Sequence, residues 1–142
     1  MAPDWVNVVA ITADGKAVLV RQFRHGTEQT TLEIPGGAVD PSDRSALAAA
    51  RRELREETGY VARRWTRLGV VDPNPAFQTN ACTTFLAEGA HPAGHPDPDE
   101  GEELEVVLVP VRRLKSLARR GVVRHALVIV AFYWWWTLRR TP

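Results

Sequence analysis

Apolar and polar positions divide the first part of the chain into runs of the length of β-strands. Trp5–Thr12 and Ala17–Arg24 are rich in aliphatic and β-branched side chains, which favour extended structure. Asp14-Gly15 between them is a strong signal for a hairpin turn. A third strand is predicted at Thr30–Ile34, before a proline and a pair of glycines. The chain therefore begins with three predicted strands, the first two joined as a hairpin.

The pattern changes to that of a helix after the glycine pair. The apolar positions between Leu47 and Leu54 fall on one helical face, which should pack on a core. Gly59 is placed to end this helix in the left-handed conformation. Asp43 or Ser45 can cap its first turn with a side-chain oxygen, and the sequence leaves both open.

The second half of the chain again alternates between strands and helices. Strands are predicted at Tyr60–Val71, Ala81–Glu88 and Leu104–Val109, and helices at Val111–Arg120 and Val122–Leu138. The long loop Gly89–Glu103 is rich in proline, glycine and acidic residues, which is typical of a functional lid or a mobile segment. The order β-β-β-α-β-β-β-α-α predicts an α/β (α+β) sandwich in a single domain spanning residues 1–142.

Charge and cysteine content narrow the classes of function. A net charge of +1 provides no overall attraction for nucleic acid, so no nucleic-acid partner is expected. The single cysteine, Cys82, excludes an internal disulfide framework and is typical of a reducing compartment. Since the N-terminus also lacks the basic and apolar regions of a signal peptide, we expect a cytoplasmic protein.

The C-terminal apolar run raises the question of a membrane or a partner subunit. Ala126–Leu138 is shorter than the roughly 20 apolar residues that a transmembrane helix needs, so no membrane association is expected. The consecutive aromatic residues Phe132–Trp136 cannot all point inward from one helix. Some must contact a partner subunit, a lipid surface or another element, and we predict a homodimer that uses this helix.

Acidic residues cluster on the first helix beside its apolar face. Glu53 and Glu57 are neighbours at four-residue spacing, with Glu56 next to them, although like charges so arranged destabilise a helix. A divalent cation between the carboxylates would account for the pattern, and oxygen-only ligands indicate Mg²⁺ or Mn²⁺. The alternative is a solvated face with ion pairs such as Arg52–Glu56. The histidines have no ligand spacing and are interpreted as surface or packing residues: His25, His91, His95 and His125.

The glycine pair and this helix together resemble the signature of the Nudix hydrolases, in which a glycine loop leads to Arg-Glu-aliphatic-x-Glu-Glu-x-Gly. The matching residues are Gly37, Arg52, Glu53, Leu54, Glu56, Glu57 and Gly59. Asp43 stands where the family has its first glutamate, one extra residue follows it, and Tyr60 replaces the final aliphatic residue. The match is long and lies in the loop–helix context that the signature requires.

The resemblance implies a Nudix-type α/β/α sandwich with a mixed central sheet, and hydrolysis of a nucleoside diphosphate linked to another group. It implies Mg²⁺ as the cofactor, with Mn²⁺ as an alternative, because a divalent cation neutralises pyrophosphate charge and activates water. The implied metal ligands are Glu53, Glu56, Glu57 and the backbone carbonyl of Gly37 or Ala38. Arg52 is expected to support catalysis by orienting these glutamates.

Further segments resemble the branch of the family that cleaves ADP-ribose and other nucleotide sugars. They are the strand ending in Arg24, the stretch Leu32–Gly37, and Pro75 in the loop that follows the helix and its next strand. The implied substrate-binding residues are Gln22, Arg24, Glu33, Pro75 and Phe77, the last by stacking on a base. Without the resemblance, Gln22 and Arg24 would be an exposed strand face and Pro75 a residue that stiffens a loop.

The acidic stretch Asp99–Val106 resembles the loop that supplies a catalytic glutamate in that branch, with a solvated loop as the alternative. Glu102 is the first candidate for the general base and Glu100 the second. The predicted reaction is Mg²⁺-dependent hydrolysis of ADP-ribose, a small nucleotide sugar, to AMP and ribose 5-phosphate. The alternatives are a (d)NTP pyrophosphatase that sanitises the nucleotide pool and a non-catalytic nucleotide- or RNA-binding module that keeps the fold.

Overall fold

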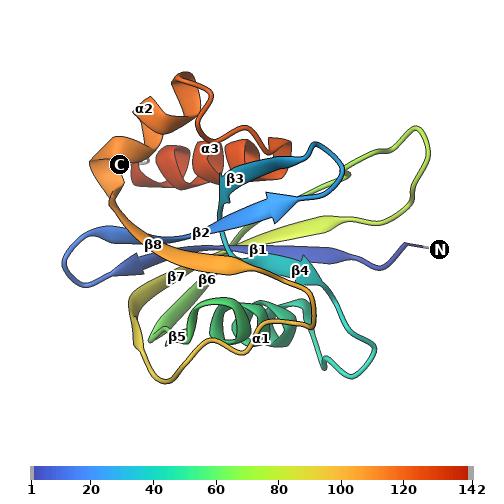
Figure 1. Cartoon of the computed structure of the whole chain (residues 1–142), viewed down its shortest axis with the longest axis horizontal. Coiled ribbons are helices and arrows are strands. Elements are labelled where there is room, and N and C mark those ends of the chain that lie inside the picture. The colour runs from blue at the N-terminus through green and yellow to red at the C-terminus, as the bar shows by residue number, and fades with distance from the viewer. Residues whose placement is uncertain (1, 141–142) are drawn as a thin grey trace.

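A mixed β-sheet forms the centre of the computed structural model, which describes residues 2–140 (Figure 1). Its strands in this range are β1 (Trp5–Thr12), β2 (Lys16–Arg24), β3 (Gln29–Glu33), β4 (Gly36–Ala38), β5 (Tyr60–Val61), β6 (Arg64–Val71), β7 (Cys82–Pro92) and β8 (Leu104–Pro110). The order is β3-β2-β1-β7-β5, with β4 paired to β1, β8 to β2 and β6 to β7. The pair β1–β7 is parallel and the other pairs are antiparallel, which confirms the predicted mixed sheet.

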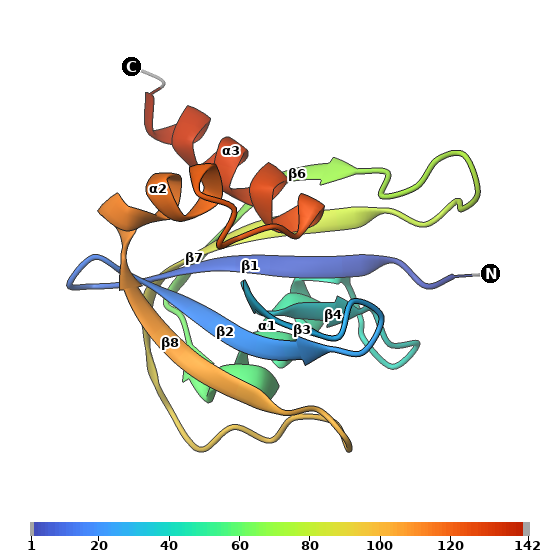
Figure 2. The same cartoon turned by 45° about the horizontal axis from the view of Figure 1, so that its top comes forward.

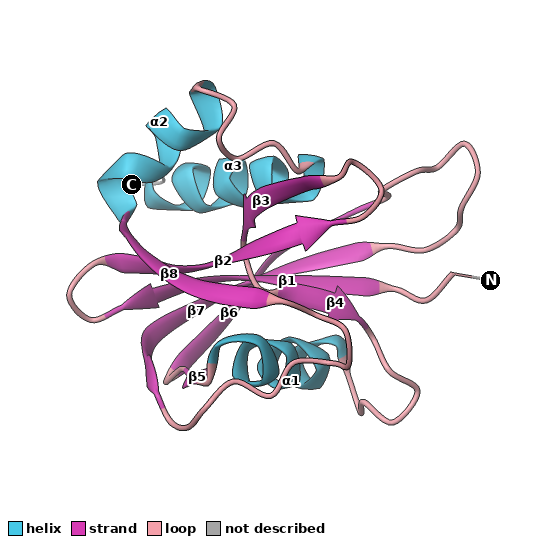
Figure 3. Ribbon diagram, in the orientation of Figure 1, coloured by secondary structure: helices cyan, strands magenta, loops and turns pink. Residues whose placement is uncertain are grey.

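Helices cover both faces of this sheet (Figure 3). One face carries α1 (Ala46–Thr58), and the other carries η1 (Val111–Arg113), α2 (Leu114–Arg119) and α3 (Ala126–Arg140). The turned view shows α3 lying across β1, β6 and β7 (Figure 2). The α/β/α layering that the sequence predicts is therefore confirmed.

The central strands are buried on both faces, which explains why their sequences are continuously apolar. In β1, Val8 and Ala10 pack in the cluster that contains α1. The alternating neighbours Val9 and Ile11 pack on the opposite side, in the cluster that contains α2 and α3. This two-sided burial holds β1 rigidly, and β1 carries one wall of the site described below.

Both ends of α1 follow the predicted chemistry, and the cap falls to Ser45 rather than Asp43. Ser45 Oγ accepts the backbone N–H of Ala48 at 3.1 Å, a contact worth about 1 kcal/mol in other helices. Gly59 adopts the left-handed conformation with φ 75°, and its N–H donates to the Arg55 carbonyl at 2.8 Å. Asp43 is thereby left available for a different partner.

Two boundaries around α1 differ from the predictions. Residues 36–38, expected to be a loop, form β4 because their backbone pairs with β1. The predicted strand Tyr60–Val71 is divided into β5 and β6. The division lies opposite Gly89, whose φ of 68° bends the partner strand β7.

The C-terminal helices are also shorter than predicted. Val111–Arg120 divides into a 3₁₀ turn and the short helix α2. The last helix begins at Ala126 instead of Val122, because the N–H groups of Val122 and Val123 donate to the Leu117 carbonyl and complete the end of α2. Its first turn starts from His125, whose carbonyl accepts the N–H groups of the third and fourth residues after it.

The aromatic run of α3 is largely accommodated within the fold. Phe132 and Trp135 are buried in the core, with 0% and 5% of their surfaces exposed. Trp134 packs on Gly69 of β6, where an added Cβ would lie 2.6 Å from the indole ring. Tyr133 alone among these is exposed, at 60%. The sequence allowed a partner subunit, a lipid surface or another element to contact this aromatic run. In the fold, part of it is contacted by another element, β6. Within residues 2–140, no helix has the length and apolar character required to cross a membrane.

Candidate active site

A cavity of about 300 Å³ opens where the sheet meets the start of α3. Gln22 and Arg24 of β2 and Glu33 of β3 line it, together with Glu57 of α1 and Glu102 of the loop before β8. Its apolar lining consists of Trp5, Val6, Ile34, Cys82, Leu127 and Val128. The lining of the cavity thus combines charged side chains with apolar ones.

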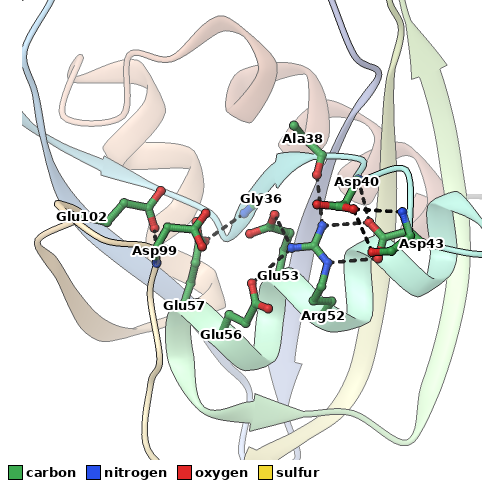
Figure 4. Close-up of polar contacts among 11 residues, drawn as sticks. Gly36, Ala38, Asp40, Asp43, Arg52, Glu53, Glu56, Glu57, Asp99 and Glu102 are labelled. Carbon is green, nitrogen blue, oxygen red and sulfur yellow. Dashed lines mark hydrogen bonds and ion pairs between the residues drawn. The ribbon is translucent and has the colours of Figure 1, made fainter.

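Arg52 is the centre of a polar network beside this cavity (Figure 4). Its Nε and Nη2 donate to the carboxylate of Asp43 at 3.0 and 2.8 Å. Its Nη1 donates to Glu53 at 3.0 Å and to Glu56 at 3.1 Å, and Nη2 also donates to the Ala38 carbonyl at 3.1 Å. These contacts, chiefly the bonds to Asp43, raise the pKa of Arg52, and the same bonds lower the pKa of Asp43. Arg52 therefore joins the glycine loop to the acidic face of α1.

Glu57 is a buried carboxyl group with 4% of its surface exposed. Burial raises the pKa of Glu57 to about 8, and Glu53 and Glu102 add to the shift through charge repulsion. The backbone N–H of Gly36 donates to Glu57 at 3.0 Å and opposes the shift. The Glu57 carboxyl is therefore held at a position from which water is largely excluded, with Glu53 and Glu102 near enough to repel its charge.

Glu53 lies one turn earlier on α1 and is also buried. Burial raises the pKa of Glu53, and Arg52 opposes this shift. A Cβ at Gly37 would lie 2.5 Å from Glu53 Oε1, so a side chain there would displace the carboxylate. The second glycine of the pair is thus required by close approach of the strand β4 to the helix.

Arg24 and Glu33 form an ion pair between adjacent strands within the cavity. Arg24 Nε donates to Glu33 Oε1 at 3.0 Å, and Thr31 Oγ1 donates to the same oxygen at 2.8 Å. Burial of Glu33 would raise its pKa, but the bonds from Arg24 and Thr31 outweigh burial and lower it. Glu33 is therefore an anion at neutral pH. The Arg24 side chain remains 43% exposed.

The loop predicted from the sequence to be a functional lid or a mobile segment, Gly89–Glu103, lies against the C-terminal end of α1. The N–H of Ala93 donates to the Gly59 carbonyl at 2.8 Å, and the N–H of Asp97 donates to the Glu56 carbonyl at 2.7 Å. Glu102, at the end of this loop, accepts the N–H of Asp99 at 3.2 Å and faces the Glu57 side of the site (Figure 4). The loop thereby places one of its glutamates at the cavity.

Other predicted site residues lie apart from the cavity. Glu100 is exposed in the loop, and Pro75 and Phe77 are exposed in the loop between β6 and β7, with Phe77 at 87%. None of the three lines the cavity. Glu53 and Glu56 are turned towards Arg52, so the ion pair Arg52–Glu56 of the alternative interpretation is present. Among residues 2–140, no three His, Cys, Asp or Glu side chains are grouped closely enough, as arranged, to hold a metal ion.

Several lining residues were missed by sequence reasoning, among them Trp5, Asn7 and His125. Asn7 interrupts an apolar strand, and this was the available signal. Its Oδ1 accepts the hydroxyl of Thr84 at 2.6 Å, and its Nδ2 donates to the Leu127 carbonyl at 3.3 Å, so it joins β1 to α3. His125 directly precedes the apolar helix α3, where a side chain can cap the first turn. In the sequence, the histidines were judged only by their spacing from one another, and that spacing does not indicate a capping position.

Comparison with known proteins agrees with this architecture. The chain is 40% identical over 86 residues to the ADP-ribose pyrophosphatase of Bacillus subtilis (strain 168), covering 61% of this chain and 46% of that protein. It is 29% identical over 125 residues to the ADP-ribose pyrophosphatase of Mycobacterium tuberculosis, covering 87% of this chain and 60% of that protein. The chain therefore spans about half the length of these curated relatives.

A solved structure described as an ADP compounds hydrolase has the same fold. The two superpose with a TM-score of 0.84 at 27% sequence identity, over 96% of this chain and 74% of the other. Residues 2–132 match the family profile of the NUDIX domain, which includes β1, the glycine pair, α1 and the start of α3. With this match and the signature residues gathered around Arg52, the chain belongs to the Nudix family.

Proposed function

We propose that this chain hydrolyses the pyrophosphate bond of a nucleoside diphosphate sugar, with ADP-ribose converted to AMP and ribose 5-phosphate. The observation that carries the proposal is the cavity in which Glu57 and Glu102 face Gln22, Arg24 and Glu33. Relatives named ADP-ribose pyrophosphatase and ADP-sugar pyrophosphatase support the choice of substrate.

Nudix hydrolases generally use divalent metal ions, and we propose Mg²⁺ for this chain, with Mn²⁺ as a substitute. The chemistry of the donors fits such an ion, because they are carboxylates and because burial and mutual repulsion raise the pKa values of Glu53 and Glu57. Glu53 and Glu56 contact Arg52 in this structure and would turn towards Glu57 to share the ion. Glu53, Glu56, Glu57 and the backbone carbonyl of Gly37 or Ala38 would hold it. When bound, the ion neutralises pyrophosphate charge and activates water.

The remaining roles belong to residues of the chain itself. Arg52 would hold Glu53 and Glu56 in position, since its fork already contacts both. The exposed part of the Arg24 guanidinium would donate to a phosphate or ribose oxygen, while Glu33 fixes its orientation. Glu102 would accept the proton of the attacking water as a new P–O bond forms and the bridging P–O bond breaks. Glu100 remains the second candidate for the base, and Pro75 and Phe77 remain candidates for the nucleotide pocket.

A substrate panel tests the proposed reaction. Turnover of ADP-ribose, GDP-mannose, NADH and 8-oxo-dGTP would be measured with Mg²⁺ or Mn²⁺, and ADP-ribose is expected to give the highest kcat/KM. A preference for 8-oxo-dGTP would favour the nucleotide-pool alternative. Absence of turnover with every compound, together with tight nucleotide binding, would favour the binding-module alternative.

The same assay assigns the base within the acidic loop. Glu102→Gln is expected to lower kcat about 10²- to 10⁴-fold, the range typical of general-base catalysis. Glu103→Gln is the matched control, because this neighbour is exposed and does not line the cavity. A larger loss in Glu100→Gln than in Glu102→Gln would transfer the role to the second candidate.

We also propose a homodimer that uses α3, in the cytoplasm. Ile129 and Tyr133 form an outward apolar strip on this helix, with 36% and 60% exposed. The buried Cys82 thiol, whose pKa burial raises to about 11, is compatible with a reducing compartment because it has little thiolate character. Sedimentation analysis is expected to give a dimer for the natural chain and a monomer for Tyr133→Glu. A natural chain that sediments as a monomer at micromolar concentration would contradict the dimer.

A further inference from the structure

His125 directly precedes α3 and lines the cavity, and one edge of its ring is fixed by the helix. Its Nδ1 accepts the backbone N–H of Leu127 at 3.1 Å, and its carbonyl accepts the N–H groups of Val128 and Ile129 at 3.0 and 3.1 Å. The side chain therefore caps the first turn as a serine or asparagine would. This bond sets both the orientation of the ring and its tautomer.

The proton of the neutral ring lies on the other nitrogen. Because Nδ1 is an acceptor, a neutral imidazole carries its hydrogen on Nε2. Within residues 2–140, Nε2 makes no hydrogen bond to the protein, and His125 lines the same cavity as Glu33. A donor of fixed direction is therefore left for a ligand.

The surroundings indicate which kind of acceptor suits this donor. Glu33 is an anion, so a phosphate is better placed at the exposed part of the Arg24 guanidinium than beside Glu33 itself. The apolar part of the lining includes Leu127 and Val128 of α3 and Trp5 of β1, and it suits a ribose or a base. A hydroxyl or a ring nitrogen, both uncharged acceptors, matches the Nε2–H donor at this place.

We propose that His125 is a substrate-contact residue, whose Nε2–H donates to a hydroxyl or ring nitrogen of the sugar or nucleoside part of the ligand. This proposal rests on the proposed hydrolysis of a nucleotide sugar, because it specifies how the same cavity recognises the parts of the substrate that flank the pyrophosphate. It gives the start of α3 a role in specificity, separate from the glutamates of α1.

Two isosteric variants separate contact with the ligand from capping of the helix. In His125→Asn, the amide oxygen replaces Nδ1 and keeps the cap, while the distal donor is lost. In His125→Gln, the amide nitrogen takes the place of Nε2, while the cap is lost. His125→Asn is expected to raise KM for ADP-ribose about fivefold to tenfold, with kcat and the melting temperature unchanged. His125→Gln is expected to keep KM near that of the natural chain and to melt about 3–4 °C lower.

The opposite pattern would overturn the proposal. A purely structural histidine predicts that His125→Asn has the KM of the natural chain and that only His125→Gln is affected, through its stability. Equal KM values for the natural chain and His125→Asn are therefore decisive against the contact, whatever the melting temperatures are.

Binding of substrate fragments identifies the part of the ligand that His125 contacts, and this test does not depend on turnover. Binding of AMP, ribose 5-phosphate and inorganic pyrophosphate would be measured by calorimetry for the natural chain and His125→Asn. Weaker binding of AMP alone places the acceptor on the nucleoside, and weaker binding of ribose 5-phosphate alone places it on the terminal ribose. An equal loss for pyrophosphate, or no loss for any fragment, overturns the proposal. If the natural chain fails to hydrolyse ADP-ribose, the proposed reaction fails, and these fragment affinities still decide the role of His125.

Discussion

Glu57→Gln is expected to abolish most turnover while it makes the metal-free protein more resistant to heat. The side chain is buried beside Glu53 and Glu102, so it would serve as a metal ligand at a point from which water is largely excluded. Loss of one charged ligand should lower kcat about 10²- to 10³-fold, since each factor of ten corresponds to about 1.4 kcal/mol. Glutamine keeps the size of the side chain and its capacity to accept the Gly36 N–H, so the fold should be retained.

The stability gain has a defined dependence on pH. The pKa of Glu57 is about 8 in the folded protein, against the ordinary value of 4.5 for a glutamate in the unfolded chain. The folded state therefore binds this proton more tightly than the unfolded state. The stabilisation is fully present below about pH 4.5 and is lost as the pH rises towards 8. Melting temperatures of the metal-free natural chain should fall across this window, and those of Glu57→Gln should fall less.

Glu88→Gln is the control for this prediction, because its partly exposed carboxylate pairs with Arg64 on the surface. It should keep full turnover and the pH profile of the natural chain. Turnover by Glu57→Gln that equals the control would contradict the assignment of Glu57 as a ligand. An identical fall in melting temperature for Glu57→Gln and the natural chain would contradict the account of its buried charge.

Arg52→Lys is expected to lower both stability and turnover although it keeps the positive charge. Lysine cannot contact Asp43, Glu53 and the Ala38 carbonyl at the same time, because it lacks the planar fork of the guanidinium. Loss of the charge-assisted bonds should cost about 2 kcal/mol, which lowers the melting temperature by roughly 6–8 °C. Misplaced glutamates should lower kcat about 10- to 100-fold.

The neighbouring Arg51 provides a matched control for this substitution. Its guanidinium lies over the ring of Trp65 at 5.8 Å from the centroid and is exposed on the outer side of α1. Arg51→Lys should change kcat by less than about twofold, because a surface cation–π contact is worth only about 0.5–1 kcal/mol. The melting temperature and kcat would be measured for Arg51→Lys and Arg52→Lys. Equal losses in the two variants would contradict the proposal that Arg52 positions the glutamates.

The Arg52 network also gives a reason for the departure from the family signature at Asp43. Sequence reasoning left Asp43 and Ser45 as equal candidates for the helix cap. In the fold, Ser45 caps α1 and Asp43 binds the guanidinium through both oxygens. The shorter aspartate therefore anchors Arg52 from the glycine loop, and this contact lies between residues nine positions apart.

Local patterns of residues were sufficient to predict most of the elements and the family of this protein. Strand β1 was predicted with its observed bounds, and α1 with its glycine end, because propensity, periodicity and capping depend on neighbouring residues. The signature from Gly37 to Gly59 is likewise contiguous, so the sequence alone identified the acidic helix and its arginine.

Tertiary structure alone decided which side chains share the cavity. The sequence does not indicate that His125 and Asn7, more than a hundred residues apart, line the same cavity, or that Trp134 packs on Gly69. The resemblance ranked Glu102 before Glu100, but only the fold shows that Glu102 reaches the cavity while Glu100 is exposed. Such contacts depend on how the helices pack across a completed sheet. Burial, charge repulsion and fixed backbone donors then set the properties of each group, and these forces arise only between segments that the fold brings together.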